Sequence, residues 1–297
     1  NIDSSSLKSI NPKLICCNIS GYGEAPEMMK KKSYDLLIQA ESGLIDVSGS
    51  PEGIGRIGVS ICDIGAGMSA HAGILESLLL RERCNKVKDV KISLFDVAAD
   101  WMTVPYIHSK YGGAAPKRVG LKHPSIAPYG AFLCSENTSF IISIQNESEW
   151  KRFCVEVLKS PALAKENKFS SNTLRVKNRD LLDKTIQSIL SSLTDETLKS
   201  RLEDASIAYG RLNTVKDLER HLALKKISVR NSLDNSLTIP SPPLIWENTE
   251  KKVPKFNQHN EQLRAEFNHR PRRQSLKSSN SSKKTWSIRH INYSIRE

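Results

Sequence analysis

Apolar residues in the first part of the chain fall into two kinds of run. Short continuous runs at residues 12–20 and 57–63 predict buried strands, and residues 90–97 predict a strand or a strand-to-helix step. Longer runs with helical spacing occupy residues 34–49 and 68–83. This alternation is typical of α/β domains.

Each helical run has an expected core face. The first face consists of Leu36, Leu37, Ala40 and Leu44. The second face consists of Met68, Ala72, Leu75, Leu78 and Leu79.

The periodicity changes in the second half of the chain. Gly, Pro, Lys and His become frequent from residue 106 to 128, which indicates a linker or an active-site loop. An α+β pattern follows and ends near Asn213, with strands expected at residues 130–134 and 139–146 and helices expected at residues 148–158, 178–193 and 195–205. A short strand pair is expected at residues 227–231 and 236–240.

The net charge of +12 suggests a nucleic acid or another anionic partner until its location is considered. Residues 269–297 contain eight Lys or Arg and one Glu, so they carry +7 of that charge. They have no sustained apolar period, which predicts a disordered basic tail. Their basic residues are not interleaved with a folded aromatic platform, which favours a solvated extension over nucleic-acid binding.

The sequence also limits the environment of the protein. No uncharged apolar run approaches the roughly 18 residues of a membrane span, so a soluble protein without a membrane partner is expected. The six cysteines lie mostly in apolar runs, which indicates reduced, packed thiols in the cytoplasm. Neither CxxC nor HxxxH occurs, so no metal site is expected. The start at Asn1 without a signal peptide indicates a fragment, and a missing presequence would make a mitochondrion the alternative location.

Asp63 is the acidic residue with the clearest chemical potential. It closes an apolar run and precedes the Gly-Ala-Gly of residues 65–67 and a predicted helix. Ligands of α/β sheets bind at such an edge, glycines permit close approach, and a poorly hydrated carboxylate can attack an activated acyl group. Alternatively, Asp63 simply caps the helix, which the residues alone favour.

Other candidate motifs have less specific patterns. The GIGRIG at residues 53–58 matches a dinucleotide fingerprint in letters, but an expected turn precedes it and an expected strand follows it, which is the wrong context. Tyr34 and Asp35 follow three lysines, residues 30–32, which could hold phosphates or form a solvated loop. His123 lies in a Pro-containing loop and is either a structural turn residue or a catalytic base.

Eight segments in order, from about Asn11 to Phe267, make the chain resemble the class III CoA-transferases, the family of formyl-CoA and carnitine CoA-transferases. The segments are ISGYG (19–23), YDLLIQAESGL (34–44), GVSICDIGAGMSAHAGILESLLLRER (58–83), VKISLFD (90–96), GLKHPSIAPYGAF (120–132), SIQNESEWKRFC (143–154), TLRVKNRDLL (173–182) and VPKFNQHNEQLRAEF (253–267).

The resemblance implies a fold and a domain organisation. Family members have a large Rossmann-like domain and a smaller α+β domain, and two subunits interlock as a homodimer. The implied domains are the second half of the large domain (1–105), a linker and active-site loop (106–124), the small domain (125–213), a return to the large domain (214–268) and the tail (269–297). Family members open with a longer segment, so the large domain is expected to be incomplete.

The resemblance also implies a mechanism. The motif that reads ICDIGAG makes Asp63 the nucleophile, acylated by an acyl-CoA and then carrying CoA as a thioester until an acceptor carboxylic acid completes the exchange. Lys32, Tyr34, Asp35 and His123 are expected to bind acyl-CoA or line the acyl site. Coenzyme A is then a substrate, and no cofactor is expected. An inactive relative serving only as a folded or oligomerisation module is the alternative.

Departures from the family pattern refine the expectation. Acyl-CoA racemases of the family have His where this chain has Tyr34, and Tyr, with a pKa of about 10, moves protons poorly, so transfer is favoured over a racemase-like reaction. Several segments are most similar to the branch acting on C4 and C5 dicarboxylic acids. Three turns that are glycine-rich in the family contain Asn85, Asn137 and Asn257 here, and Asn tolerates positive φ.

Overall fold

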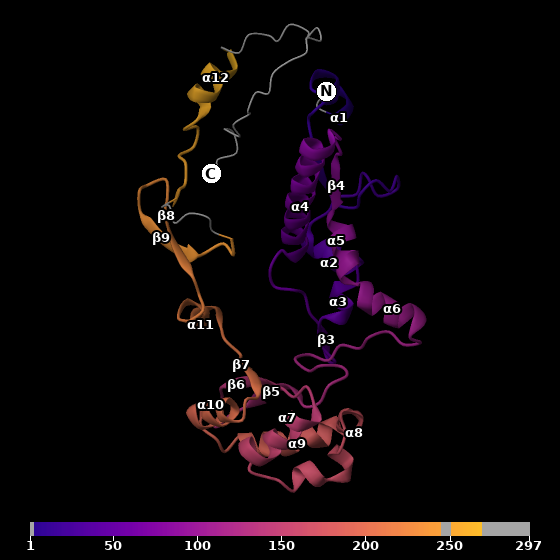
Figure 1. Cartoon of the computed structure of the whole chain (residues 1–297), viewed down its shortest axis with the longest axis vertical. Coiled ribbons are helices and arrows are strands. Elements are labelled where there is room, and N and C mark those ends of the chain that lie inside the picture. Colours follow the sequence, from indigo (N-terminus) through magenta and orange to yellow (C-terminus); the bar gives the residue numbers. More distant parts are fainter. Residues whose placement is uncertain (1–2, 245–250, 269–297) are drawn as a thin grey trace. The chain divides into compact units, whose positions relative to one another are not determined.

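The computed structural model describes residues 3–244 and 251–268, so the expected basic tail lies outside the described residues. The chain divides into two compact units, Asn1–Leu212 and Asn213–Glu297. None of the described helices is long and apolar enough to cross a membrane. The elements are coloured along the sequence in Figure 1.

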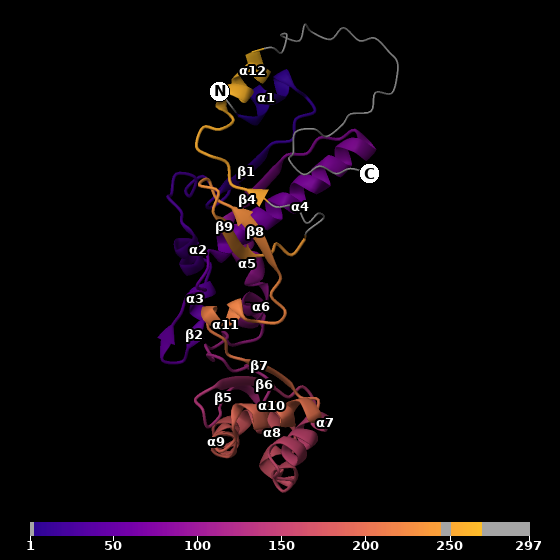
Figure 2. The same ribbon diagram turned by 90° about the vertical axis from the view of Figure 1, so that its left-hand side faces the viewer.

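The first unit begins with a small parallel sheet and the helices around it. Its elements are α1 (Ser4–Ile10), β1 (Cys17–Ser20), α2 (Asp35–Glu41), α3 (Leu44–Val47), β2 (Gly49–Ser50), β3 (Gly53–Ile54), α4 (Ile61–Cys84), β4 (Val90–Ser93), α5 (Leu94–Trp101) and α6 (Thr103–Tyr111). Strands β1 and β4 pair in parallel, and α4 packs against β4 and α5, as Figure 2 shows. A core of Tyr22, Ile38, Leu44, Cys62 and Ala98 lies between these elements.

Helix α4 corrects one prediction and confirms another. The helix expected at residues 68–83 is present, but it begins at Ile61, and residues 57–60 form no strand. A short apolar run is equally compatible with a strand and with the start of a buried helix, and here the run continues directly into the helix. Asp63 therefore lies in the first turn of α4 rather than at the end of a strand.

The elements expected on either side of GIGRIG, residues 53–58, are only partly confirmed. A helix does follow these glycines, because α4 begins at Ile61. Residues 51 and 52, directly before the motif, form the expected turn, and β3 consists of the motif's own first two residues, which pair antiparallel with β2. A dinucleotide fingerprint needs a buried parallel strand at that place, so the preceding segment still differs from that motif.

Both expected core faces are wrong in detail. Of the first face, Leu44 is buried as expected, whereas Leu36, Leu37 and Ala40 are exposed. The buried residues of α2 are Ile38 and Gln39. In α4 the expected face is largely exposed, and the buried positions are Cys62, Gly65, Ala66, Ala70 and Ser77. Small side chains let α4 approach β4 and α5 closely. Because the helix is apolar on more than one side, the spacing of its apolar residues did not predict which side is buried.

Two further expectations were only partly met. The strand expected at residues 12–20 is reduced to β1, whose first three residues are exposed; among the described strands, β4 alone pairs with it. The segment expected to lose regular structure from residue 106 includes the end of α6. The expected step from strand to helix at residues 90–97 is confirmed by β4 and α5.

Gly65 is needed where α4 meets α5, and this gives a stability prediction. A Cβ at Gly65 would lie 2.4 Å from the Trp101 ring and 2.8 Å from a Val97 methyl, whereas one at Gly67 would meet nothing within 4 Å. Gly65→Ala should therefore lower the free energy of unfolding by about 1–3 kcal/mol. The matched Gly67→Ala should raise it by about 0.5–1 kcal/mol, since alanine favours a helix. Urea unfolding of both variants measures this, and equal effects would contradict it.

The rest of the first unit contains an antiparallel sheet covered by helices. Its elements are β5 (Tyr129–Leu133), β6 (Ser139–Ser143), α7 (Glu147–Arg152), a π-helical segment (Phe153–Val157), two 3₁₀ turns (Leu163–Lys165 and Asn167–Phe169), α8 (Asn172–Lys177), α9 (Arg179–Leu190), α10 (Asp195–Asp204) and β7 (Ala208–Arg211). The sheet order is β5-β6-β7. The expected strands and helices are present, and α8 and β7 are additions. The large core includes Phe140, Ile142, Trp150, Leu182 and Ile186.

The described residues of the second unit form short helices and short strands. It contains α11 (Val215–Glu219), β8 (Lys226–Arg230), β9 (Ser236–Pro240), β10 (Lys251–Lys252) and α12 (Asn260–Asn268). Strands β8 and β9 pair antiparallel, as expected, and β10 adds to β8 in parallel. The described residues thus form a mixed α/β fold with small sheets, which confirms the expected class at that level.

Candidate active site at the start of helix α4

Asp35 caps the helix that carries Asp63. Asp35 Oδ1 accepts hydrogen bonds from the backbone N–H groups of Cys62 at 2.7 Å and Asp63 at 3.3 Å. Ser60, the residue that precedes the helix, makes no side-chain cap bond. Asp35, the first residue of α2, therefore satisfies two of the N–H groups that a helix start leaves without partners.

The side chain of Asp63 is left free by this arrangement. It is exposed, and it makes no hydrogen bond or ion pair with any residue that the structure describes. The alternative in which Asp63 itself caps α4 is therefore wrong, because Asp35 supplies the cap. An exposed carboxylate on a fixed helical turn is able to attack an electrophile from solvent.

Gln39 completes the network, and the sequence analysis missed it. Its Nε2 donates to Asp35 Oδ2 at 2.6 Å, and its Oε1 accepts from the Ile57 N–H at 3.0 Å. Gln39 is fully buried. The spacing of Asp35 and Gln39, four residues apart on a helix, is a signal that could have indicated their contact.

Two of the other expected site residues lie just before α2. Tyr34, next to Asp35, is 71% exposed and takes the N-cap position of α2 in extended conformation. Lys32 is exposed, and the described part of the chain provides no hydrogen bond or ion pair for its ammonium group. The hydrogen bonds of the cap place Asp35 itself at the turn that carries Asp63, and Tyr34 is its neighbour in the chain.

His123 lies in a loop of its own. Its ring stacks on Tyr129 with centroids 5.2 Å apart, and its Nδ1 accepts the Ser125 N–H at 3.2 Å. A neutral ring with Nδ1 as acceptor carries its proton on Nε2. No interaction in the described residues joins His123 to Asp35 or Asp63.

Cys62 lies beneath Asp63 and has a perturbed thiol. Burial, followed by the nearby Asp35 carboxylate, raises the pKa of Cys62 to about 11. All six cysteines are free thiols, and Cys62, Cys134 and Cys154 are buried. The expectation of packed thiols is confirmed for these three but not for Cys17 and Cys84, which are exposed.

Thiol labelling tests this part of the structure. With maleimide at pH 8, Cys17 and Cys84 should react rapidly, because they are exposed. Cys62 should react on the order of 100-fold more slowly, because burial blocks access and a raised pKa leaves little thiolate. Peptide mass spectrometry of the labelled chain measures the rates. Rapid labelling of Cys62 in the native chain would contradict the described packing.

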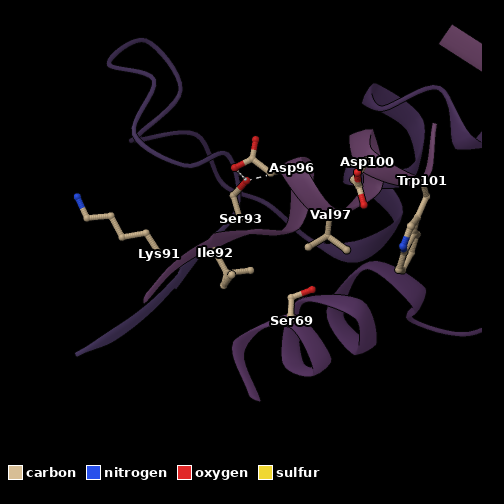
Figure 3. Close-up of a pocket in the computed structure, with 8 residues that line it drawn as sticks. All are labelled: Ser69, Lys91, Ile92, Ser93, Asp96, Val97, Asp100 and Trp101. Carbon is tan, nitrogen blue, oxygen red and sulfur yellow. Dashed lines mark hydrogen bonds between the residues drawn. The ribbon is translucent and has the colours of Figure 1, made fainter. Parts of the chain in front are cut away.

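A hollow of about 200 Å³ lies beside this site, between α4, β4 and α5 (Figure 3). Part of its polar lining has structural partners: Asp96 accepts a hydrogen bond from Ser93 at 2.6 Å, and Lys91 pairs with Glu24. Its lining does not include Asp63. No three His, Cys, Asp or Glu side chains of the described residues gather closely enough to hold a metal ion.

The described residues form a mixed α/β fold, and the first turn of α4 presents the free carboxylate of Asp63 as a potential nucleophile. The model of CoA-transferase family III matches residues 1–260, and the chain belongs to this family. The expected resemblance and enzyme class are thereby confirmed.

Three relatives are named as CoA-transferases of dicarboxylic acids, as the resemblance implied. The chain is 25% identical over 275 residues to the succinate–glutarate CoA-transferase of Agrobacterium fabrum, covering 90% of the chain and 68% of the relative. It is 28% identical over 272 residues to the acetyl-CoA:oxalate CoA-transferase of Acetobacter aceti, covering 88% and 68%. It is 30% identical over 213 residues to the mouse (Mus musculus) succinyl-CoA:glutarate CoA-transferase, covering 71% of the chain but only 48% of the relative.

Solved structures agree with the fold. The chain is similar to a CAIB/BAIF family protein from Brucella suis, with a TM-score of 0.75, 28% identity and coverage of 89% of this chain and 71% of that one. A structure from Mycobacterium tuberculosis has a TM-score of 0.74 at 21% identity, with coverage of 91% and 71%, and supports the fold alone.

Proposed function

We propose that this protein transfers CoA between an acyl-CoA thioester and a carboxylic acid through a covalent intermediate on Asp63. The observation that carries the proposal is the exposed, unpartnered carboxylate of Asp63 on a turn that another residue caps. Its place inside the family-matched region supports the same role.

The proposed reaction is a series of acyl transfers between carboxylate and thiolate groups, and each transfer forms one bond and breaks another. Asp63 attacks the thioester carbonyl, the carbon–sulfur bond breaks, and CoA thiolate leaves an acyl-aspartyl anhydride. The thiolate then attacks the Asp63 carbonyl, which releases the donor acid and forms an aspartyl-CoA thioester. The acceptor carboxylate displaces the thiolate to form a new anhydride, and the thiolate attacks its acyl carbonyl, giving the new acyl-CoA and free Asp63. Each step consumes one anion and forms another, so no residue has to move a proton.

The neighbouring side chains have roles that suit this chemistry. Tyr34, largely exposed beside the Asp35 cap, is proposed to line the acyl site. Lys32, an unpaired cation among the described residues, is suited to an anionic part of the substrate. We extend the acyl site to the loop of His123, as the resemblance implies. We assign Asp35 a structural role, because both of its carboxylate oxygens accept hydrogen bonds within the protein.

The names of the relatives support small dicarboxylic acids as substrates, with succinate and glutarate as the first to test. Coenzyme A would enter as a substrate thioester, and we propose no cofactor. We assign the reaction to the cytoplasm, since all six thiols are free.

The finer architecture of the family is also proposed for this chain. We propose that β1, β4 and their helices belong to a Rossmann-like large domain and that two subunits interlock. An apolar stripe on α4 supports a partner: Ile64, Met68, Leu75 and Leu79 are each about half or more exposed.

An exchange assay tests the proposed function. The chain is incubated with succinyl-CoA and glutarate, and glutaryl-CoA is measured by liquid chromatography and mass spectrometry. We expect glutaryl-CoA and free succinate to appear in equal amounts, because the exchange conserves the thioester. Thioester loss by hydrolysis alone, without any new acyl-CoA from a panel of dicarboxylic acids, would contradict the proposal.

A further inference from the structure

The cap of helix α4 comes from outside the helix. Serine is a common N-cap, yet Ser60 does not cap α4. The N–H groups of Cys62 and Asp63 both donate to Asp35, which lies 28 residues before Asp63 in the chain. The position of the turn that carries Asp63 therefore depends on where α2 holds the Asp35 carboxylate.

The second oxygen of Asp35 is engaged as well. It accepts from Gln39 Nε2 at 2.6 Å, and the same amide nitrogen reaches the carbonyl oxygen of Ile57 at 3.4 Å. Gln39 also accepts the Ile57 N–H, so it ties Asp35 to the loop that leads into α4. A carboxylate used in this way cannot turn toward a substrate without releasing the start of α4.

We infer that Asp35 and Gln39 form a clamp that positions Asp63, and that Asp35 does not itself contact substrate. This rests on the proposed role of Asp63. The Asp63 side chain has no partner among the described residues, so the backbone turn alone sets its direction. A displacement of about 1 Å in such a group can lower a rate by roughly 100-fold. Asp35 and Gln39 are thus positioning residues.

The clamp can be broken and rebuilt with reversed polarity. Asp35→Asn keeps one side-chain oxygen that accepts the Cys62 N–H. Its new amide N–H₂ group faces the amide N–H₂ group of Gln39, and two donors cannot form a hydrogen bond. Adding Gln39→Glu places a carboxylate opposite that amide, which restores the hydrogen bond and the original net charge. Glu76→Gln is the matched control, since Glu76 is exposed on α4 and has no hydrogen bond or ion pair to a described residue.

Two readouts separate positioning from direct chemistry. One is amide hydrogen exchange in peptides covering residues 58–66, and the other is the single-turnover rate of hydroxamate formation on Asp63 from succinyl-CoA and hydroxylamine. Asp35→Asn should speed exchange on the order of tenfold, as for a lost cap, and slow acylation on the order of 100-fold with little change in KM. The double variant should move both values back toward those of the unaltered chain, and Glu76→Gln should change neither.

Three results would overturn the inference: unchanged exchange in Asp35→Asn, faster exchange in that variant with unchanged acylation, or a double variant that recovers exchange but not acylation. If the double variant does not fold, Gln39→Met removes the support while keeping Asp35. It should speed exchange and slow acylation, and normal values of both would overturn the clamp. If the unaltered chain forms no hydroxamate while exchange changes as expected, the proposed function fails and the clamp stands.

Discussion

Asp63→Asn should abolish CoA transfer, with a loss of at least about 10⁴-fold in the rate of glutaryl-CoA formation from succinyl-CoA and glutarate. An amide in place of the carboxylate cannot displace a thiolate effectively, and the Asp35 carboxylate, which contacts the same helical turn, is engaged in hydrogen bonds. The measurement is the initial rate under saturating substrates.

Stability provides the control for this variant. Asp63 is exposed and makes no hydrogen bond through its side chain to the described residues, so its replacement should change the free energy of unfolding by no more than about 0.5 kcal/mol. A folded Asp63→Asn chain that retains activity within tenfold of the unaltered chain would show that another group is the nucleophile.

Arg175→Ala should have the largest effect on stability, a loss of about 3–5 kcal/mol in the free energy of unfolding. Arg175 is only 1% exposed and donates to the carbonyl oxygens of Ala127 at 2.7 Å and Phe169 at 3.1 Å, and to both carboxylate oxygens of Glu147. Its removal takes the Arg175 donor away from the two buried carbonyl oxygens, of Ala127 and Phe169, and opens a cavity beside Trp150. Urea unfolding followed by circular dichroism measures the loss.

Two comparisons make this prediction specific. Lys177→Ala, on the exposed side of the same helix, should cost less than about 0.5 kcal/mol, and Glu147→Gln about 1 kcal/mol, because Glu147 is half exposed. The hydrogen bond from Arg175 lowers the pKa of Glu147, so this stabilisation should be present above about pH 4.5 and be lost as the pH falls further. Equal losses for Arg175→Ala and Lys177→Ala would contradict the buried network.

Local features of the fold were predictable from the sequence. The turns at Asn85, Asn137 and Asn257 were expected to need positive φ, and the structure gives φ values of 52°, 57° and 62°. The strand-to-helix step at β4 and α5 and the antiparallel pair of β8 and β9 were also foreseen. Each of these depends on a few neighbouring residues, whose chemistry restricts the backbone directly.

Burial was harder to predict than secondary structure. In α4 the large residues Met68 and Leu75 were expected inside, but the buried positions include Gly65, which lies against α5, and Ala66. When a helix is apolar on several sides, the identity of its packing partner decides which side is buried, and that partner is not encoded in the helix itself. Strand β7 was missed for a related reason, since its pairing with β6 bridges residues far apart in the chain.

In the candidate site, too, the local motif was predictable and the contacts between distant residues were not. The resemblance of its motif made Asp63 the candidate nucleophile, whereas the network that holds its turn was not foreseen. Asp35 was expected to contact substrate, but its carboxylate binds backbone N–H groups of a distant helix. Gln39 was not singled out at all, because a buried amide is recognisable only when the loop containing Ile57 is placed beside it.

The central claim, that Asp63 carries the transferred group, is tested most directly by trapping. The chain is incubated with succinyl-CoA and hydroxylamine, digested, and analysed by peptide mass spectrometry, with Asp63→Asn treated in parallel. The account predicts a hydroxamate on Asp63 that requires succinyl-CoA and is absent from the variant. A hydroxamate on a different carboxylate, or none on Asp63 while the chain forms glutaryl-CoA, would contradict it.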